Sequence, residues 1–283
     1  MDWSSRKRLI IWLCIFSLLG FIVSSPPATA TPTAKARPRT VWHPKLNDTF
    51  QLQLSGVLNT SVAATIYDID LFDSSSSQIA LLKKDDHKVV CYFSAGSSED
   101  WRADYAKFLP GDMGKPLQGW QGENWLDIRS SNVRKVMRAR IDLALKKGCD
   151  GVDPDNVDGY SNSTGFPLTK KNQLDYNRFL SHQAHLRGLA VGLKNDIAQI
   201  GVLALSFEFA VNEQCHEFDE CTAYRAFTSI GKPVLNVEYQ QRYVENTDGA
   251  FVALCAKARS ENLHTLVLPL LLDGTSRLSC DQK

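Results

Sequence analysis

Short apolar runs recur along the chain, and each is followed by a polar or acidic turn and then by a helical pattern. The runs are rich in Val, Ile, Leu, Phe and Tyr and do not alternate strictly with polar residues, which is typical of strands buried on both faces of a sheet. We predict a β-strand at eight such segments: residues 50–54, 64–69, 88–93, 151–153, 189–193, 207–211, 233–237 and 265–270.

Apolar side chains spaced by three and four predict helices between these strands. One helix is expected to end at Gly148, behind two lysines, and another at Gly188, because glycine often terminates a helix. The predicted helices begin at the caps Ser130 or Ser131, Thr169, and Asp248 or Gly249.

Eight strands alternating with helices in about 250 residues predict an α/β fold, a closed (β/α)₈ barrel that forms a single domain. An open doubly wound sheet is the alternative. No G-x-G-x-x-G follows the first strand, which argues against the nucleotide-binding version of that fold. The chain shows no short repeat and no internal linker, so we assign residues 41–283 to one domain.

The N-terminus has the pattern of a secretory signal. The basic head Arg6-Lys7-Arg8 precedes an uncharged apolar run over residues 9–23, and Ala28-Thr29-Ala30 fits a cleavage site. The run is shorter than the roughly 20 residues of a spanning helix, which favours cleavage after residue 30. We therefore expect a secreted protein with no stable membrane insertion, with a retained signal anchor as the alternative. Residues 31–40 are predicted to be a flexible tether.

Six of the seven cysteines remain once Cys14 leaves with the signal. An even number in an exported chain predicts disulfides, and Cys215 and Cys221 are close enough in sequence to close one loop. The other four allow three pairings, and the two that lie in or beside apolar strands could instead be free buried thiols. These four are Cys91, Cys149, Cys255 and Cys280. The glycosylation sequons begin at Asn47, Asn59 and Asn162.

The charge balance excludes several classes of function. The chain has 32 basic and 31 acidic residues, which gives no bias toward nucleic acid or a membrane surface. A serine hydrolase elbow and an H-E-x-x-H zinc motif are missing from the sequence, and Val157 breaks the calcium-loop pattern that begins at Asp153. We expect no metal, no cofactor and a monomeric enzyme.

Acidic residues follow seven of the eight predicted strands. The carboxyl ends of barrel strands meet at one mouth, so these side chains would converge there. A single acid at a strand end is often only a helix cap, as Asp70, Asp73 or Asp158 could be. A concentration of acids suits glycoside hydrolysis, in which one carboxyl donates a proton and a second acts as nucleophile or base.

Aromatic residues near the same strand ends offer flat faces for sugar rings: Trp42, Trp101, Trp120, Trp125, Tyr92, Tyr160 and Tyr239. Trp101 and Trp125 could also be ordinary packing under loops. Lys194 could be a structural ion-pair partner rather than a substrate ligand.

Several motifs together resemble one known family, the endo-α-1,4-polygalactosaminidases of glycoside hydrolase family 114. The matching segments are QLQLSG at 51–56, YDID at 67–70, CYFSAGS at 91–97, GW at 119–120, ENWLDIR at 123–129, GVDPDNVDGY at 151–160, GLKND at 192–196 and NEQC at 212–215. They extend over nearly the whole chain after the signal. The chain departs from the family pattern at Asp153, where Glu is frequent, and at Glu208, where Asp is frequent.

The resemblance implies a (β/α)₈ barrel and endo-cleavage of an α-1,4-linked galactosamine polymer with retention of configuration. It implies Asp155 as the nucleophile and Glu213 as the acid/base. A partly deacetylated polymer is cationic, and an acid-lined mouth would attract it. The expected substrate contacts are Asp68, Asp70, Tyr92, Asp153, Asn156, Asp158, Tyr160, Lys194, Asn195, Asp196, Asn212, Glu238, Trp120 and Trp125. A non-catalytic carbohydrate-binding barrel and a hydrolase of a different glycan are the alternative functions.

Overall fold

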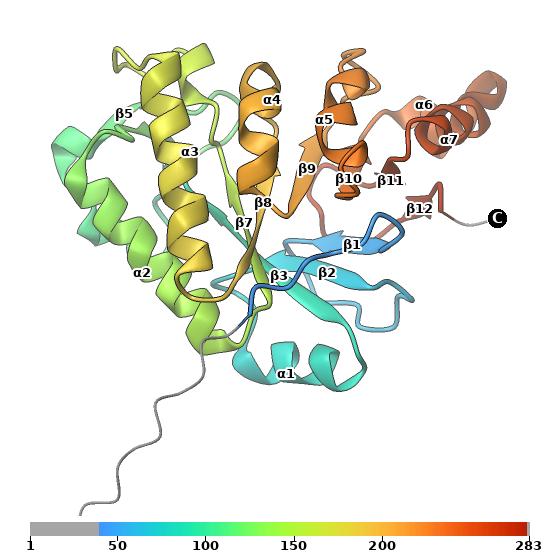
Figure 1. Ribbon diagram of the computed structural model, residues 1–283, viewed down its shortest axis with the longest axis horizontal. Helices are drawn as coiled ribbons and strands as arrows, with labels where there is room; N and C mark the ends of the chain where they lie inside the picture. The colour runs from blue at the N-terminus through green and yellow to red at the C-terminus, as the bar shows by residue number, and fades with distance from the viewer. Residues whose placement is uncertain (1–39, 282–283) are drawn as a thin grey trace, which may run out of the picture. The chain divides into compact units, whose positions relative to one another are not determined.

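A nine-stranded sheet organises the computed structural model, which describes residues 40–281 (Figure 1). Eight strands are parallel and follow one another in chain order across the sheet. They are β1 (Phe50–Gln53), β2 (Ile66–Asp70), β3 (Lys88–Ser94), β7 (Gly151–Asp155), β8 (Ala190–Lys194), β9 (Phe209–Glu213), β10 (Val234–Glu238) and β11 (His264–Val267). The ninth strand, β12 (Leu278–Ser279), is antiparallel to β11.

All eight predicted strands are confirmed, with ends that differ by a few residues. The largest difference is in the last strand, which ends at Val267 rather than at residue 270. Pro269 has no N–H to offer a ladder, and a turn follows in which the Leu272 amide donates to the Pro269 carbonyl. The prediction of an α/β fold is therefore confirmed.

Helices connect most of the consecutive parallel strands (Figure 1). They are α1 (Ser76–Lys84), α2 (Ser131–Lys147), α3 (Lys170–His185), α4 (Ile200–Leu203), α5 (Arg225–Thr228), α6 (Gln241–Val244) and α7 (Ala250–Ser260). The predicted caps of α2 and α3 are confirmed: the Ser130 hydroxyl accepts the amides of Asn132 and Val133, and Thr169 forms a capping box with Asn172. The helix predicted to begin at Asp248 or Gly249 is α7.

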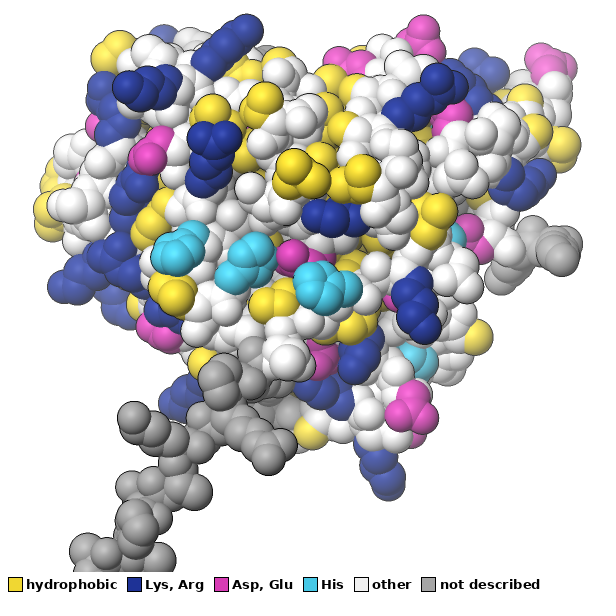
Figure 2. Space-filling view, viewed as in Figure 1, with side chains coloured by type: hydrophobic (Ala, Val, Ile, Leu, Met, Phe, Trp, Pro, Cys, Tyr) yellow, Lys and Arg dark blue, Asp and Glu magenta, His cyan; other side chains and the backbone are white. Residues whose placement is uncertain are grey.

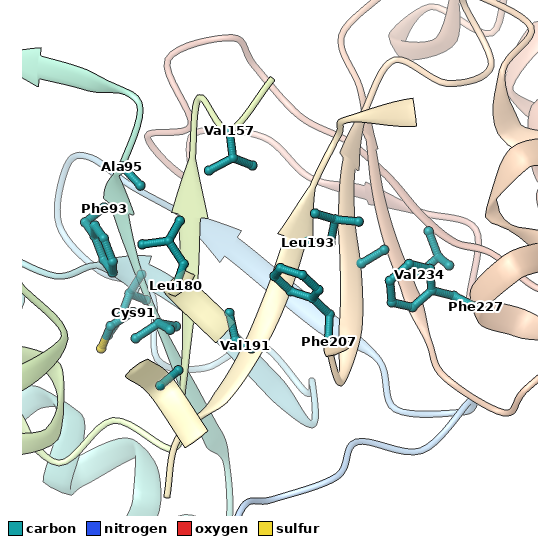
Figure 3. Packing of buried hydrophobic residues seen from close by; sticks show 14 of the residues in the cluster. Cys91, Phe93, Ala95, Val157, Leu180, Val191, Leu193, Phe207, Phe227 and Val234 are labelled. Atoms are coloured by element: carbon teal, nitrogen blue, oxygen red, sulfur yellow. The ribbon is translucent and has the colours of Figure 1, made fainter. Parts of the chain in front are cut away.

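The strands are buried on both faces because side chains alternate between an inner and an outer core. Inner residues, such as Phe50, Val90, Phe209 and Leu266, pack together inside the curled sheet. The outer core lies between the strands and the helices; Figure 3 shows Cys91, Phe93 and Leu193 on strands beside helical Leu180. This double burial explains why the sequence shows apolar runs rather than strict alternation.

The two edges of the parallel sheet approach each other without a strand ladder between β1 and β11 in the described residues. The amides of Leu54 and Ser55 both donate to the carbonyl of Leu272. The Arg277 guanidinium donates to the carbonyl of Phe50 at 2.9 Å, which connects β1 to the segment just before β12. Residues of both edges also share the inner core.

An insertion that the sequence reading did not predict lies between β3 and α2. It forms a second, three-stranded antiparallel sheet of β4 (Ser97–Glu99), β6 (Glu123–Leu126) and β5 (Met113–Pro116). The insertion begins at the carboxyl end of β3, so it places its side chains at the end of the large sheet where the acidic residues collect.

Three disulfides join Cys91 to Cys149, Cys215 to Cys221, and Cys255 to Cys280. The pairing predicted for Cys215 is confirmed. The reading of Cys91 and Cys149 as free buried thiols is wrong, because the fold brings β3 next to the residues that precede β7.

No helix within residues 40–281 is long and apolar enough to span a bilayer. The predicted signal, residues 1–30, and most of the tether lie outside the described residues. On the face that carries α3 and α4, hydrophobic side chains form small separate groups among charged ones (Figure 2).

Candidate active site

A cavity of about 510 Å³ opens at the carboxyl ends of the parallel strands. Asp155 at the end of β7, Lys194 at the end of β8 and Glu213 at the end of β9 line its floor. These three side chains therefore meet at one end of the sheet, as the strand-end argument predicted. Further predicted residues in the lining are Asp70, Tyr92, Trp120, Trp125, Asn156, Asp158 and Asn195.

Lys194 joins the two carboxylates predicted to carry the chemistry. Its ammonium nitrogen lies 3.2 Å from Asp155 Oδ1 and 3.2 Å from Glu213 Oε1. Only 2% of the Lys194 side chain is exposed, whereas the two carboxylates reach the cavity surface. The Tyr92 hydroxyl donates to the other oxygen of Asp155 at 2.9 Å. The ion pairs fix the separation and orientation of the two acids.

The backbone around Asp155 is held in an uncommon conformation. Asn156 has a φ of 59°, and its amide donates to Asp155 Oδ1 at 2.7 Å. Its side-chain nitrogen donates to the hydroxyls of Ser94 and Ser97. Gly96 packs so closely that a Cβ there would lie 1.7 Å from the Asn156 carbonyl oxygen. The SAGS motif therefore contains glycine because β3 and β7 end against each other.

Glu213 is positioned by Asn195, which also has a positive φ, 47°. The Asn195 side-chain oxygen accepts the amide of Glu213 at 3.1 Å and the side-chain nitrogen of Asn212 at 3.2 Å. Asn212 is itself buried, and its oxygen accepts the Cys215 amide. Asn195, directly after β8, and Asn212, within β9, thus orient one acid.

Two fully buried acids lie beneath Lys194. Asp68 and Asp153 adjoin each other, and no other described residue donates a hydrogen bond to either carboxyl group, so the proton held by Asp68 is the donor available to Asp153. Burial raises the pKa of Asp153 to about 7, against the opposing effect of the Lys194 ammonium. Burial and the neighbouring Asp153 raise the pKa of Asp68 well above its usual range. The structure does not bring these two predicted substrate contacts to the cavity surface; both interact electrostatically with Lys194.

Arg102 neutralises the acids on one side of the cavity. Its guanidinium lies 2.6 Å from Asp70, 2.8 Å from Glu99 and 3.2 Å from Asp73. Asp70 also accepts the amides of Phe72 and Asp73, as an acid at a strand end often does. Asp70 is therefore in the cavity wall, with its oxygens occupied by protein donors.

Glu123 is a cavity acid that the strand-end reading missed, because it comes from the inserted sheet. Burial raises the pKa of Glu123 to about 7, although the Ser97 hydroxyl that donates to it opposes the rise. The signal for Glu123 was present in the family motif ENWLDIR.

Apolar side chains form the rim of this cavity. Trp101 is 54% exposed and Trp120 is 48% exposed, whereas Trp125 is buried. Leu270 and Leu271, from the turn after β11, are also exposed and line the cavity. Exposed aromatic and aliphatic surface beside fixed polar groups is typical of a ligand site. Trp42 packs against the inner core instead.

A second cavity, of about 350 Å³, adjoins the first and shares Asp158, Asn195 and Glu213 with it. Tyr160 and Asp196 lie in its wall together with Asn212. Burial raises the pKa of Asp196 to about 8, and the negative charge of Asp158 adds to the rise. Burial raises the pKa of Asp158 to about 6, and the negative charge of Asp155 adds to the rise.

Glu238 is a predicted substrate contact that the structure places elsewhere. Its neighbours Leu235 and Val237 belong to the inner core, so alternation turns Glu238 to the outer side of the sheet. There it is fully buried and accepts the amide of His216. Direct contact with a substrate in the cavity is not supported for Glu238.

One group of metal-type ligands occurs within residues 40–281, formed by Cys215, His216 and Cys221. The disulfide uses both sulfurs, so neither is available as a thiolate ligand.

Comparison with known proteins shows which family the sequence matches. The model for glycoside-hydrolase family GH114 matches residues 31–283. Aspergillus fumigatus Ega3, solved in complex with galactosamine, is 40% identical, with a TM-score of 0.80 over 87% of this chain and all of that chain. No curated protein matches the sequence.

A more distant solved structure has the same fold. The glycoside hydrolase domain of PelA from Pseudomonas aeruginosa is 16% identical, with a TM-score of 0.64 over 82% of this chain and 98% of that domain. At this identity the likeness supports the arrangement of strands and helices alone.

Proposed function

The chain belongs to glycoside-hydrolase family GH114, and from this membership we propose that it cleaves galactosamine-containing polysaccharide internally, at α-1,4 linkages, outside the cell. Its family makes it a glycoside hydrolase. The substrate proposal draws support from the similarity to Ega3, which was solved with galactosamine, and from the acidic lining of the cavity.

The observation that carries the mechanism is the Lys194 bridge between Asp155 and Glu213. Glu213 donates its proton to the glycosidic oxygen while Asp155 attacks the anomeric carbon, and the bond to the leaving sugar breaks. The resulting glycosyl ester is then attacked by water, whose proton passes to the Glu213 carboxylate, and Asp155 leaves. Protein groups therefore return to their starting protonation states.

The geometry favours retention of configuration over inversion. Asp155 Oδ1 and Glu213 Oε1 each lie 3.2 Å from the same nitrogen, so these two oxygens are separated by no more than twice that distance. Inverting enzymes leave roughly 6.5–9.5 Å between the two carboxyl groups to admit a water molecule, and retaining enzymes about 5–5.5 Å. The bound on these two oxygens lies just below the inverting range and supports the retaining mechanism.

The organisation of the chain forms part of the same proposal. We take residues 1–30 as a cleaved signal, 31–40 as a tether and 41–283 as the catalytic domain of a monomeric enzyme. The three disulfides favour an oxidising compartment. The shared inner core and the contacts of Leu272 with β1 support closure of the sheet into a (β/α)₈ barrel.

The test compares wild type with Asp155→Asn and Glu213→Gln on a partly deacetylated α-1,4-galactosamine polymer. Each variant should release oligosaccharides ~10²–10⁴-fold more slowly than wild type, because each lacks one of the two carboxyl groups that carry out the reaction. Asp175→Asn, an equal change of charge on the exposed side of α3, is the matched control and should keep wild-type activity. Turnover by either active-site variant at the control's rate would refute the assigned pair.

The order of the two roles is tested with small nucleophiles. Azide should restore turnover to Asp155→Ala and give a glycosyl azide of inverted configuration, since it replaces the enzyme nucleophile. Azide rescue of Glu213→Ala should give the retained configuration. The opposite pattern would exchange the two roles.

A further inference from the structure

The two cavities that meet at Glu213 differ in how their acids are neutralised. We call the larger one, with Trp101 and Trp120 at its rim, the aromatic lobe. The smaller one, with Asp158, Asp196 and Glu220 in its wall, is the acidic lobe. Both contain Glu213, so a polymer cleaved there must place sugar units on both sides of that residue.

Most acids of the aromatic lobe have protein cations as partners. Arg102 pairs with Asp70, Asp73 and Glu99, and Lys194 pairs with Asp155. Arg102 is almost completely buried, so its charge is permanently part of this wall. Glu123 and Asp158 also line this lobe without an ion pair among the described residues, so the lobe keeps negative charge but has two protein cations beside it.

The acidic lobe has no such partner. Its lining, all of it within residues 40–281, contains no lysine or arginine. Asp158, Asp196 and Glu220 form no ion pair within this described part of the chain, and Glu213 is shared with Lys194. The lobe therefore presents uncompensated acidic groups next to the reacting bond.

Asp196 carries the strongest sign that a ligand belongs in this lobe. Only 3% of the residue is exposed, and Oδ1 forms no hydrogen bond of normal length with a described residue, although the Tyr160 hydroxyl is close enough to act on this carboxylate. The other oxygen, Oδ2, accepts the side-chain nitrogen of Asn177 at 2.9 Å. A buried acceptor without a donor is costly, and an unfilled ligand site is one reason for it to persist.

The backbone of the lobe is also strained. Asn195 and Asp196 are consecutive left-handed residues, with φ of 47° and 48°, and Gln214 has a φ of 66°. Left-handed conformations of residues other than glycine are uncommon and cluster at binding and catalytic sites. Here they turn the ends of β8 and β9 toward the same small cavity.

The protonation behaviour of the two acids agrees with a missing cation. Burial raises the pKa of Asp196 to about 8 and that of Asp158 to about 6, because water is removed without a positive charge in exchange. The neutral side chains of Tyr160 and Asn177 lower the pKa of Asp196 only in part. An ammonium group placed between the two acids would favour both carboxylates.

We propose that the acidic lobe is a subsite for the free ammonium group of one hexosamine unit, with Asp158 and Asp196 as its counter-charges. This inference rests on the proposed function and refines its substrate. The volume of about 350 Å³ is within the roughly 300–1,000 Å³ of small-ligand sites. The lobe contains Glu213 without Asp155, so it lies on the side of the proton donor and receives the leaving sugar.

The consequence is a rule for where the polymer is cut. The sugar that becomes the new non-reducing end must carry a free amine, whereas the new reducing end, in the aromatic lobe, tolerates an acetylated amine. An N-acetyl group has no charge to balance Asp158 and Asp196.

The experiment digests a partly acetylated α-1,4-galactosamine polymer with wild type, Asp158→Asn and Asp196→Asn, and sequences both new ends by mass spectrometry. Wild type should give only free amines at the new non-reducing ends and a mixture at the reducing ends. Both variants should relax that rule, and KM on fully deacetylated polymer should rise about 10- to 100-fold with a smaller change in kcat. Asp196→Asn keeps a side-chain oxygen that can accept from Asn177, so the fold is preserved.

Acetylated units at the new non-reducing ends of wild-type products, or unchanged selectivity in both variants, would overturn the subsite while leaving the proposed function intact. Asp175→Asn, on the same helix as Asn177, should behave as wild type.

Binding gives a readout that does not depend on turnover. Deacetylated and acetylated galactosamine oligomers are titrated calorimetrically into Asp155→Asn, with and without Asp158→Asn. Asp155→Asn should prefer the deacetylated oligomer, and this preference should disappear in the double variant; that result supports the subsite. If wild type cleaves no polymer, the proposed function is refuted, but this binding result still supports the subsite. Equal affinity for both oligomers would overturn the subsite.

Discussion

Replacing Asp153 with asparagine should stabilise the protein at neutral and basic pH and have little effect in acid. Asp153 and Asp68 are fully buried beneath Lys194, and no other described residue donates a hydrogen bond to either carboxyl group. An asparagine at position 153 removes one of the two acids and places an N–H donor beside Asp68. The change keeps the shape of the side chain, so the surrounding core need not repack.

The size of the effect follows from the pKa of Asp153, which is about 7 in the folded protein and about 3.9 in an unfolded chain. The folded state therefore holds a proton that the unfolded state has lost between these two values, and stability falls as pH rises through that window. The difference corresponds to about 4 kcal/mol above pH 7. Because Asp68 and Lys194 share in the titration, we expect about 2–4 kcal/mol.

Urea unfolding with the disulfides intact, followed from pH 4 to pH 8, measures this difference. The variant and wild type should unfold at similar urea concentrations at pH 4, and the variant's midpoint should exceed that of wild type by about 1 M at pH 8. His216, whose pKa burial lowers to about 4, is common to both proteins and cancels in the comparison. A difference that stays constant with pH, or a variant less stable than wild type at pH 8, would refute the reasoning.

Two further predictions concern the bridge and the disulfides. Lys194→Met removes the cation shared by Asp155 and Glu213 and should lower kcat/KM at least about 10²-fold with an unchanged circular dichroism spectrum, and activity within about threefold of wild type would contradict a role in positioning the acids. Replacing Cys91 and Cys149 by alanine opens a loop with a sequence separation of 58 and should cost about 4 kcal/mol, against about 2 kcal/mol for Cys215 and Cys221, which are separated by 6. Unfolding of the two double variants in urea measures both costs, and equal losses would contradict the loop-entropy account.

The sequence alone predicted the strands and the longer helices because their signals are local. Apolar runs mark strands that are buried on both faces of the sheet. Ser130, Thr169 and Gly148 fix helix ends through local hydrogen bonds with the helix backbone. The same reasoning reached Asp155, Lys194 and Glu213, since parallel strands bring their carboxyl ends to one edge.

Only the tertiary structure decided which strand-end acids face the cavity. Side chains alternate along a strand, so Glu213 points inward while Glu238 turns to the outer core, and one residue of register separates the two outcomes. Asp68 and Asp153 point to the inside of the sheet but are fully buried below the cavity surface.

Contacts between distant segments decided the rest. The inserted sheet brings Glu123 to the cavity, Arg102 neutralises Asp70, and Cys91 meets Cys149 across neighbouring strands. Periodicity and capping describe residues a few positions apart, whereas charge compensation and disulfide pairing depend on which segments pack together. The sequence by itself therefore determined the elements and the catalytic candidates, and the packing decided the protonation, the two lobes and the pairing of the cysteines.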